Sequence, residues 1–167
     1  KCTFCHYGLD TPPHNVDMEE GLFLKIIDQL KAISFRGSLG LFEINEPLTD
    51  KRIYDFLCYS RNNLPHAWLI LTTNGDLLNH KNAEFLFASG LNYLYLNSYD
   101  GVARTRNIQL LSNIDARYTK NIVHIDRTYQ IDWGSRAGNV AQHKQEKVLK
   151  PCDYVYNVLY IKPSGKV

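Results

Sequence analysis

The sequence predicts an α/β fold with mainly parallel strands. Strand-like and helix-like stretches alternate through the middle of the chain, and Gly, Pro, Asn or Asp marks each change from one to the next. This alternation is typical of βαβ units. Residues 67–73 form a nearly continuous apolar run, which favours a parallel strand covered on both faces.

Composition narrows the class of protein. The 167 residues are enough for one domain with a buried core, and 44% hydrophobic with 22% charged residues argue against disorder or a coiled coil. A net charge of +2 gives no support to nucleic-acid binding. No apolar run approaches the roughly 20 residues that span a bilayer, so we expect no membrane segment. Four cysteines make no disulfide framework, which favours a reducing, cytoplasmic location.

The first two helices have clear sequence signals. Asp17 is the expected N-cap of the first, and Glu20 completes a capping box. The apolar face of this helix, which should cover a sheet, consists of Leu22, Phe23, Ile26, Ile27, Leu30 and Ile33. A strand at 38–44 follows, and Asp50 then caps a helix whose inward residues are Ile53, Phe56 and Leu57.

The later elements repeat the alternation. After the strand at 67–73 we expect a helix at 80–89, a strand at 91–96, a helix at 104–114 and a strand at 121–125. Residues from about 128 to 151 are polar connector, before a strand at 154–161 and a turn at 162–165. The chain begins at Lys1 and ends inside this expected hairpin, so we expect a piece of a longer protein. Cys58 is expected to be a small buried hydrophobic residue, and His124 a core or strand histidine.

Polar residues follow each predicted strand, where parallel α/β folds place their ligand sites. These residues are Asn45-Glu46-Pro47, Thr73-Asn74-Gly75-Asp76, Asn97-Ser98-Tyr99-Asp100-Gly101 and Asp126-Arg127. Asn, Asp, Ser and Gly at such positions also make ordinary turns and helix caps. Glu46 is harder to explain in that way because glutamate is a poor turn former.

The N-terminal cluster Lys1-Cys2-Thr3-Phe4-Cys5-His6 is the most specific feature, because two thiolates three positions apart can bind one soft metal centre. Cys2, Cys5 and His6 match the CxxCH pattern of covalent haem attachment. The same CxxC suits half of a zinc site or a thiol-disulfide motif. Covalent haem proteins are usually small and helical, whereas this chain is predicted to be α/β. A zinc site would need a second ligand pair, which the sequence lacks. The redox motif needs a helix directly after it, and the first helix is expected only after Asp17. An inert pair of buried cysteines is the remaining interpretation.

Cys2-Thr3-Phe4-Cys5 resembles the second half of the CxxxCxxC signature of the radical S-adenosylmethionine enzymes, in which an aromatic residue such as Phe4 often precedes the last cysteine. The first cysteine would lie upstream of Lys1. The resemblance implies that Cys2 and Cys5 are ligands of a 4Fe-4S cluster. In the family, the iron without a protein ligand binds the amino and carboxylate groups of S-adenosylmethionine.

The strand ends continue this resemblance in order. Ile44-Asn45-Glu46-Pro47 is similar to the family's GGEP segment, which implies that Asn45 and Glu46 bind the cofactor, with Glu46 at the methionine amino group. Thr72-Thr73-Asn74-Gly75 resembles TTNG and brings Thr73 and Asn74 into the cofactor site. The segment at 97–101 resembles SxDG, which implies Ser98 near the ribose together with Asp100. Arg104, or else Arg106, could reach the cofactor carboxylate.

The C-terminal part is similar to radical enzymes with a SPASM-type domain. Arg136-Ala137-Gly138 matches a linker found in them, and Cys152 precedes Gly165 by a spacing that suits an auxiliary iron-sulfur cluster. The resemblance therefore implies a radical core at 1–130, a linker at 131–151 and the start of an auxiliary domain at 152–167, with Cys152 as a metal ligand. The core would be a partial (βα) barrel of the TIM type, and the auxiliary part a small β-hairpin.

The family resemblance also implies a function. The reduced cluster would generate a 5′-deoxyadenosyl radical that abstracts hydrogen from a peptide, protein, sugar or alcohol, with flavodoxin or ferredoxin as electron donor. We expect the chain alone to be inactive because it holds two of the three cluster thiolates. The alternative function is a non-catalytic module for metal binding or electron transfer that uses Cys2, Cys5, His6 and Cys152.

Overall fold

The computed structural model describes residues 17–42, 45–128 and 157–166. The chain divides into two units, one formed by Phe23–Tyr129 and the other by Lys1–Leu22 together with Gln130–Val167. The first of these units contains the whole described sheet.

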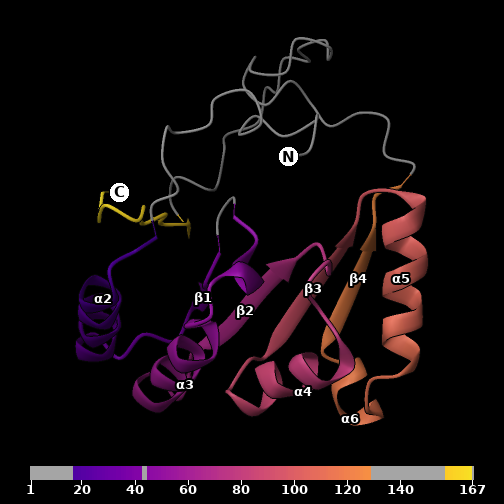
Figure 1. Cartoon of the computed structure of the whole chain (residues 1–167). Helices are drawn as coiled ribbons and strands as arrows, with labels where there is room; N and C mark the ends of the chain where they lie inside the picture. The colour runs from indigo at the N-terminus through magenta and orange to yellow at the C-terminus, as the bar shows by residue number, and fades with distance from the viewer. Residues whose placement is uncertain (1–16, 43–44, 129–156, 167) are drawn as a thin grey trace, which may run out of the picture. The chain divides into compact units, whose positions relative to one another are not determined.

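Four parallel strands form that sheet in the order β1-β2-β3-β4, and Figure 1 shows them side by side. The strands are β1 (Ser38–Gly40), β2 (Trp68–Thr73), β3 (Tyr93–Ser98) and β4 (Ile122–Asp126). The predicted α/β fold with a parallel sheet is thereby confirmed. Parallel pairing in chain order brings the carboxyl ends of all four strands to one edge of the sheet.

Helical segments precede β1 and connect the four strands. They are α2 (Glu20–Ala32), the 3₁₀-helix η1 (Pro47–Thr49), α3 (Ile53–Asn63), α4 (His80–Ala88), α5 (Gly101–Ser112) and α6 (Ala116–Thr119). Helix α5 begins three residues before the predicted position because the Asp100 carboxylate accepts a hydrogen bond from the Ala103 amide at 2.7 Å and caps it there. Among the described helices, none has the length and apolar character needed to cross a membrane.

The core lies between one face of the sheet and its helices. Leu71 and Leu94 are paired in register, and both are fully buried. Other fully buried apolar residues are Ile27, Leu57, Leu69, Leu86 and Leu96. The opposite face of the sheet is more open among the described residues, since Trp68 is 50% exposed and stacks on Tyr93 with 5.7 Å between ring centroids. The sequence predicted that strand 67–73 is covered on both faces. Among the described residues, one face is covered and the other is partly open.

Three local expectations need correction. Ile33 is 71% exposed because α2 ends one residue before it, so it does not belong to the buried face. Cys58 is exposed, because its position on α3 follows Leu57, whose side chain occupies the inward direction. The first strand is shorter than predicted, since β1 ends at Gly40 and residues 43–44 lie outside the described part.

The described residues of the other unit include the predicted turn at 162–165. The Gly165 amide donates to the Lys162 carbonyl at 2.8 Å, and Gly165 has φ 78°, a conformation that favours glycine. The turn is therefore confirmed. The strand predicted before it is not found at residues 157–161, where Leu159 is 67% exposed and no sheet partner is present among the described residues.

Candidate functional site

Polar side chains from three strand ends meet at the carboxyl edge of the sheet. The Thr73 hydroxyl, at the end of β2, donates to the Glu46 carboxylate 27 residues away at 2.7 Å. At the other side, Ser98 of β3 is paired in register with Asp126 of β4. We call the linked side chains Glu46, Thr73, Asn74, Asn97, Ser98, Asn107, His124 and Arg127 the carboxyl-edge network.

Glu46 connects the segment after β1 to the end of β2. Its Oε1 accepts from the Leu48 amide at 3.2 Å and from Thr73 Oγ1 at 2.7 Å, and its Oε2 accepts from the Asn74 amide at 3.0 Å. Glu46 is thus the N-cap of η1 and a clamp on β2 at once. A carboxylate offers about four acceptor positions, so three donors leave capacity for one more on Oε2.

The turn after β2 has a shape that only glycine permits. Thr73 is 2% exposed and its Oγ1 accepts from the Gly75 amide at 3.0 Å, while Asn74 Oδ1 accepts from the Asp76 amide at 2.7 Å. Gly75 has φ 80°, and a Cβ there would lie 2.5 Å from Asn107 Oδ1. The Thr-Asn-Gly sequence therefore has a structural reason that is independent of any ligand.

Ser98 points into the protein rather than toward solvent. It is fully buried, its Oγ accepts from Asn107 Nδ2 at 3.0 Å, and His124 Nε2 lies 2.8 Å from the same oxygen. The Ser98 hydroxyl therefore links Asn107 of α5 to His124 of β4. His124 is partly buried on β4, in agreement with its expected place in a strand.

Asp100 and the two candidate arginines lie on α5. Asp100 is the N-cap residue of the helix, and it is exposed. Arg104 Nε donates to Asp126 Oδ2 at 2.6 Å, which directs it to the end of β4. Hydrogen bonds from Thr128, and then Arg104, lower the pKa of Asp126 to about 2. Arg106 instead reaches the turn after β2, where it pairs with Asp76 at 2.6 Å and donates to the Asn74 carbonyl at 3.0 Å.

Sequence reasoning assigned no specific role to three members of the network. Asn97 is 2% exposed and its Oδ1 accepts from Arg127 Nε at 2.9 Å, while Asn107 is fully buried in the middle of α5. Asn97 and Arg127 were recognised from the sequence only as polar residues at strand ends, without a role of their own. Asn107 gave no signal, because one polar residue in a helix ordinarily faces water.

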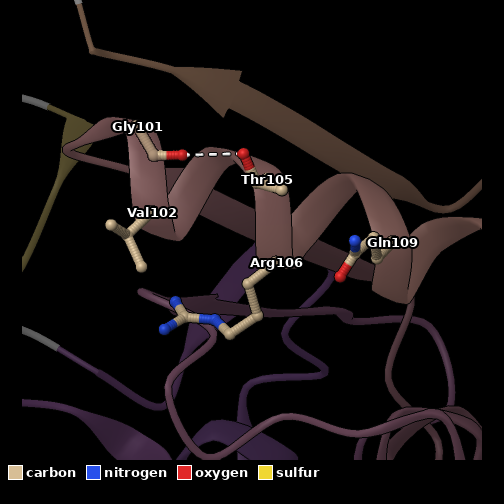
Figure 2. Close-up of a pocket in the computed structure, with 5 residues that line it drawn as sticks. All are labelled: Gly101, Val102, Thr105, Arg106 and Gln109. Atoms are coloured by element: carbon tan, nitrogen blue, oxygen red, sulfur yellow. Dashed lines mark hydrogen bonds between the residues drawn. The ribbon is translucent and has the colours of Figure 1, made fainter.

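A shallow groove of about 410 Å³ runs along the outside of α5. Figure 2 shows the side chains of Val102, Arg106 and Gln109 along it, with the Thr105 hydroxyl bonded to the Gly101 carbonyl. A neighbouring groove of about 560 Å³ is lined by Leu78, Asn79, His80, Arg106, Gln109, Leu110 and Asn113. Of the cofactor-binding residues predicted from the sequence, only Arg106, the alternative to Arg104, lines these grooves.

The predicted cluster ligands are outside the described residues. This applies to Cys2, Phe4, Cys5 and Cys152, whereas Asn45 is described and exposed beside Glu46. Within residues 17–42, 45–128 and 157–166, no group of three or more His, Cys, Asp or Glu side chains could hold a metal ion. The iron-sulfur ligands therefore stay predictions.

Comparison with known proteins points to enzymes that use S-adenosylmethionine. No family model matches the chain. It is 25% identical over 100 residues to the S-adenosyl-L-methionine-dependent 2-deoxy-scyllo-inosamine dehydrogenase of Niallia circulans, a match that covers 60% of this chain and 40% of the relative.

Solved structures give the same indication for the fold. The crystal structure of BtrN in complex with AdoMet and 2-DOIA superposes with a TM-score of 0.76 at 21% identity, covering 86% of this chain and 57% of that one. BtrN in an open conformation gives a TM-score of 0.59 at 22% identity, over 77% and 51% of the two chains. The chain thus has the fold of this part of BtrN and spans little more than half of that protein.

The assignment to SPASM-bearing enzymes is wrong. The relative and the solved structures that match are the dehydrogenase and BtrN, and none of these matches indicates a SPASM-type domain. The assignment depended on a three-residue linker string and on one Cys-to-Gly spacing, and strings this short recur by chance. The only described part of that segment is 157–166, which contains a turn but no strand.

Proposed function

We propose that the protein is a radical S-adenosylmethionine enzyme that dehydrogenates an alcohol carbon of a small polar substrate. The observation that carries this proposal is the Glu46 clamp on Thr73 and Asn74, since it joins two family-like motifs 27 residues apart at the ligand-binding edge of a parallel sheet. The similarity to a dehydrogenase that depends on S-adenosyl-L-methionine supports the same conclusion.

The donor and acceptor set at this edge fits the amino-acid part of the cofactor. Glu46 Oε2 accepts a single backbone amide and retains acceptor capacity for an ammonium group. A charge-assisted hydrogen bond of that kind contributes about 1.5 to 3 kcal/mol. Arg104, which is paired with the exposed Asp126, is the cation that would receive the cofactor carboxylate.

The buried serine changes the role that the family resemblance implied for Ser98. Because its hydroxyl is enclosed between Asn107 and His124, Ser98 would fix the end of β3 and not touch the ribose directly. Asp100 is exposed in the same turn and uses its Oδ1 to cap α5, so its Oδ2 can accept a ribose hydroxyl. Asn45 and Asn74 would complete the polar lining near Glu46.

Cys2 and Cys5, beside Phe4, would hold the 4Fe-4S cluster together with a third thiolate. When bound, the cluster and S-adenosylmethionine supply the one-electron chemistry that removes a hydrogen atom from a substrate carbon. The residues of this chain would bind and orient the cofactor, and the sheet edge would shield the reacting atoms from water. A one-electron donor protein such as flavodoxin or ferredoxin would supply the reducing electron.

The substrate class follows the relative. Its name describes dehydrogenation of an aminocyclitol, so we propose a polyhydroxylated ring compound or a similar alcohol as substrate. The expectation of a peptide or protein substrate depended on the resemblance to SPASM-bearing enzymes. Because that assignment is wrong, we do not propose such a substrate.

The test is reductive cleavage of S-adenosylmethionine. The full-length gene product, purified without oxygen and supplied with iron and sulfide, should release 5′-deoxyadenosine on addition of dithionite. Glu46→Gln should lower cofactor affinity about tenfold or more, because its amide would oppose the Asn74 N–H, whereas Asp115→Asn, at the start of α6 near the opposite end of the sheet (Figure 1), should not. A protein that takes up only zinc or haem and releases no 5′-deoxyadenosine would contradict the proposal.

A further inference from the structure

Asn107 is a buried polar residue that the proposed site does not use directly. It lies in the middle of α5 and is fully buried. An amide enclosed in this way is costly unless it is hydrogen-bonded. Its Nδ2 lies 3.3 Å from the Asn74 carbonyl, 3.4 Å from the Asn97 carbonyl and 3.0 Å from Ser98 Oγ.

These acceptors belong to two different turns. Asn74 is in the turn after β2, whereas Asn97 and Ser98 end β3. The amide of Asn74 donates to Glu46 while its carbonyl accepts from Asn107, so both sides of one residue are fixed. A continuous chain of hydrogen bonds therefore runs from Glu46 through Asn74 and Asn107 to Ser98.

Steric contact reinforces this connection. The Asn107 side chain packs so closely on Gly75 that any Cβ there would come within 2.5 Å of Oδ1. Arg106 donates to the same Asn74 carbonyl at 3.0 Å and lies 3.4 Å from Asn107 Oδ1, so adjacent residues of α5 hold one turn. The turn after β2 cannot shift relative to α5 without breaking these contacts.

We propose that Asn107 is a positioning residue that sets the distance between the turn at 73–76 and the turn at 97–100, and thereby the fit of S-adenosylmethionine. This inference rests on the proposed function. Asn107 itself is sealed from solvent, so it would not touch a cofactor bound at the sheet edge. It acts through Asn74 and through the β3 end that precedes Asp100, which are the groups placed at the cofactor.

The test is Asn107→Asp, which keeps the shape of the side chain and its acceptor for Arg106 but replaces the donating amide by an oxygen facing three other oxygens. The matched control is Asn92→Asp. Asn92 is an asparagine at the opposite end of the sheet whose Oδ1 accepts from the Leu69 amide at 2.7 Å and from Arg61, so aspartate preserves its role. Asn107→Ala serves as a second variant if the aspartate does not fold.

Affinity for S-adenosylmethionine is measured by calorimetry on the anaerobic, cluster-loaded full-length product. We expect the dissociation constant to rise at least tenfold in the Asn107 variant and to change less than twofold in the Asn92 variant. Amide hydrogen exchange without cofactor should become faster at residues 73–78 and 97–103 only in the Asn107 variant.

Equal affinity in the Asn107 variant and the wild type would overturn the positioning role while leaving the proposed function intact. A wild type that binds no S-adenosylmethionine would overturn both. Unchanged exchange at the two turns would overturn the coupling between them whatever the affinity shows.

Discussion

At each end of the sheet, one side chain donates hydrogen bonds to several groups of the neighbouring loops, but the two ends differ in the charged groups that surround it. At the amino end, Arg61 of α3 donates to the carbonyls of Leu64, Pro65, Ala67 and Gly90 and to the side chain of Asn92. At the carboxyl end, Asn107 of α5 donates to the turns after β2 and β3. Arg61 packs against Gly90 and Asn107 packs against Gly75, and both glycines have positive φ. We call Arg61 with its acceptors the Arg61 hub.

The difference lies in what remains unused. In the Arg61 hub, the guanidinium is used by backbone carbonyls and by the side-chain amide of Asn92. Burial lowers the pKa of Arg61. The carboxyl end holds Glu46, Asp100 and Asp126, whose carboxylates keep acceptor positions for a ligand. The hydrogen bonds of the Arg61 hub therefore hold loops in place, whereas the accessible carboxylates at the carboxyl end can also bind a ligand.

The largest effect is expected from the two glycines. Gly75→Ala and Gly90→Ala each place a Cβ at positive φ and within 2.5 or 2.6 Å of a packed neighbour. Each should lower the free energy of unfolding by roughly 2 to 4 kcal/mol. Urea unfolding measures this, with Gly21→Ala as control because nothing lies within 4 Å of its Cβ position. Only the Gly75 change should also weaken cofactor binding, and equal affinities would break the comparison.

Removing the amino-end hub comes next. Arg61→Met retains much of the side-chain stem but leaves partly buried carbonyls without their donor, and it should cost roughly 1 to 3 kcal/mol of stability. Affinity for S-adenosylmethionine, measured on folded protein, should stay within twofold of the wild type. A large loss of affinity would mean that the two ends of the sheet are not independent.

The buried serines provide a smaller, matched test. Ser98 has two hydrogen-bond partners, whereas Ser60 Oγ, equally buried, has no partner among the described residues. Ser98→Ala removes the hydrogen bonds that Ser98 makes with Asn107 and His124 and should destabilise by about 1 to 2 kcal/mol, while Ser60→Ala should be neutral or slightly stabilising. Thermal unfolding compares them, and equal shifts would remove Ser98 from the network.

The smallest effect concerns Asp50, near the start of α3. The side-chain hydrogen bond from Arg52 lowers the pKa of Asp50 below its ordinary value of 3.8. The carboxylate therefore stabilises the fold above pH 4, and this contribution is lost as the pH falls through the lowered pKa. Asp50→Asn should cost about 0.5 to 1 kcal/mol at pH 7. The difference from wild type should vanish at strongly acidic pH, as urea unfolding at several pH values would show.

The sequence predicted β2 and β3 well because both carry buried alternating leucines between clear turn signals, and the polar strand ends predicted the edge at which the carboxyl-edge network lies. Ile33 and Cys58 were misplaced, since a helix end and the rotation of a helix face depend on packing that periodicity alone does not fix. Asn107 could not be predicted, because its partners come from residues 74, 97 and 98, which only the folded chain brings together. The assignment to SPASM-bearing enzymes was wrong because short spacings carry little information.

The most direct test of the account is to map where the cofactor binds. Amide hydrogen exchange of the anaerobic, cluster-loaded full-length product is recorded with and without saturating S-adenosylmethionine. The account predicts that the cofactor slows exchange at residues 45–49, 73–78 and 97–104, at the carboxyl edge, and leaves the Arg61 hub at 64–68 and 89–92 unchanged. Protection at the amino end, or no protection at the three carboxyl-edge segments while the cofactor is bound, would contradict it.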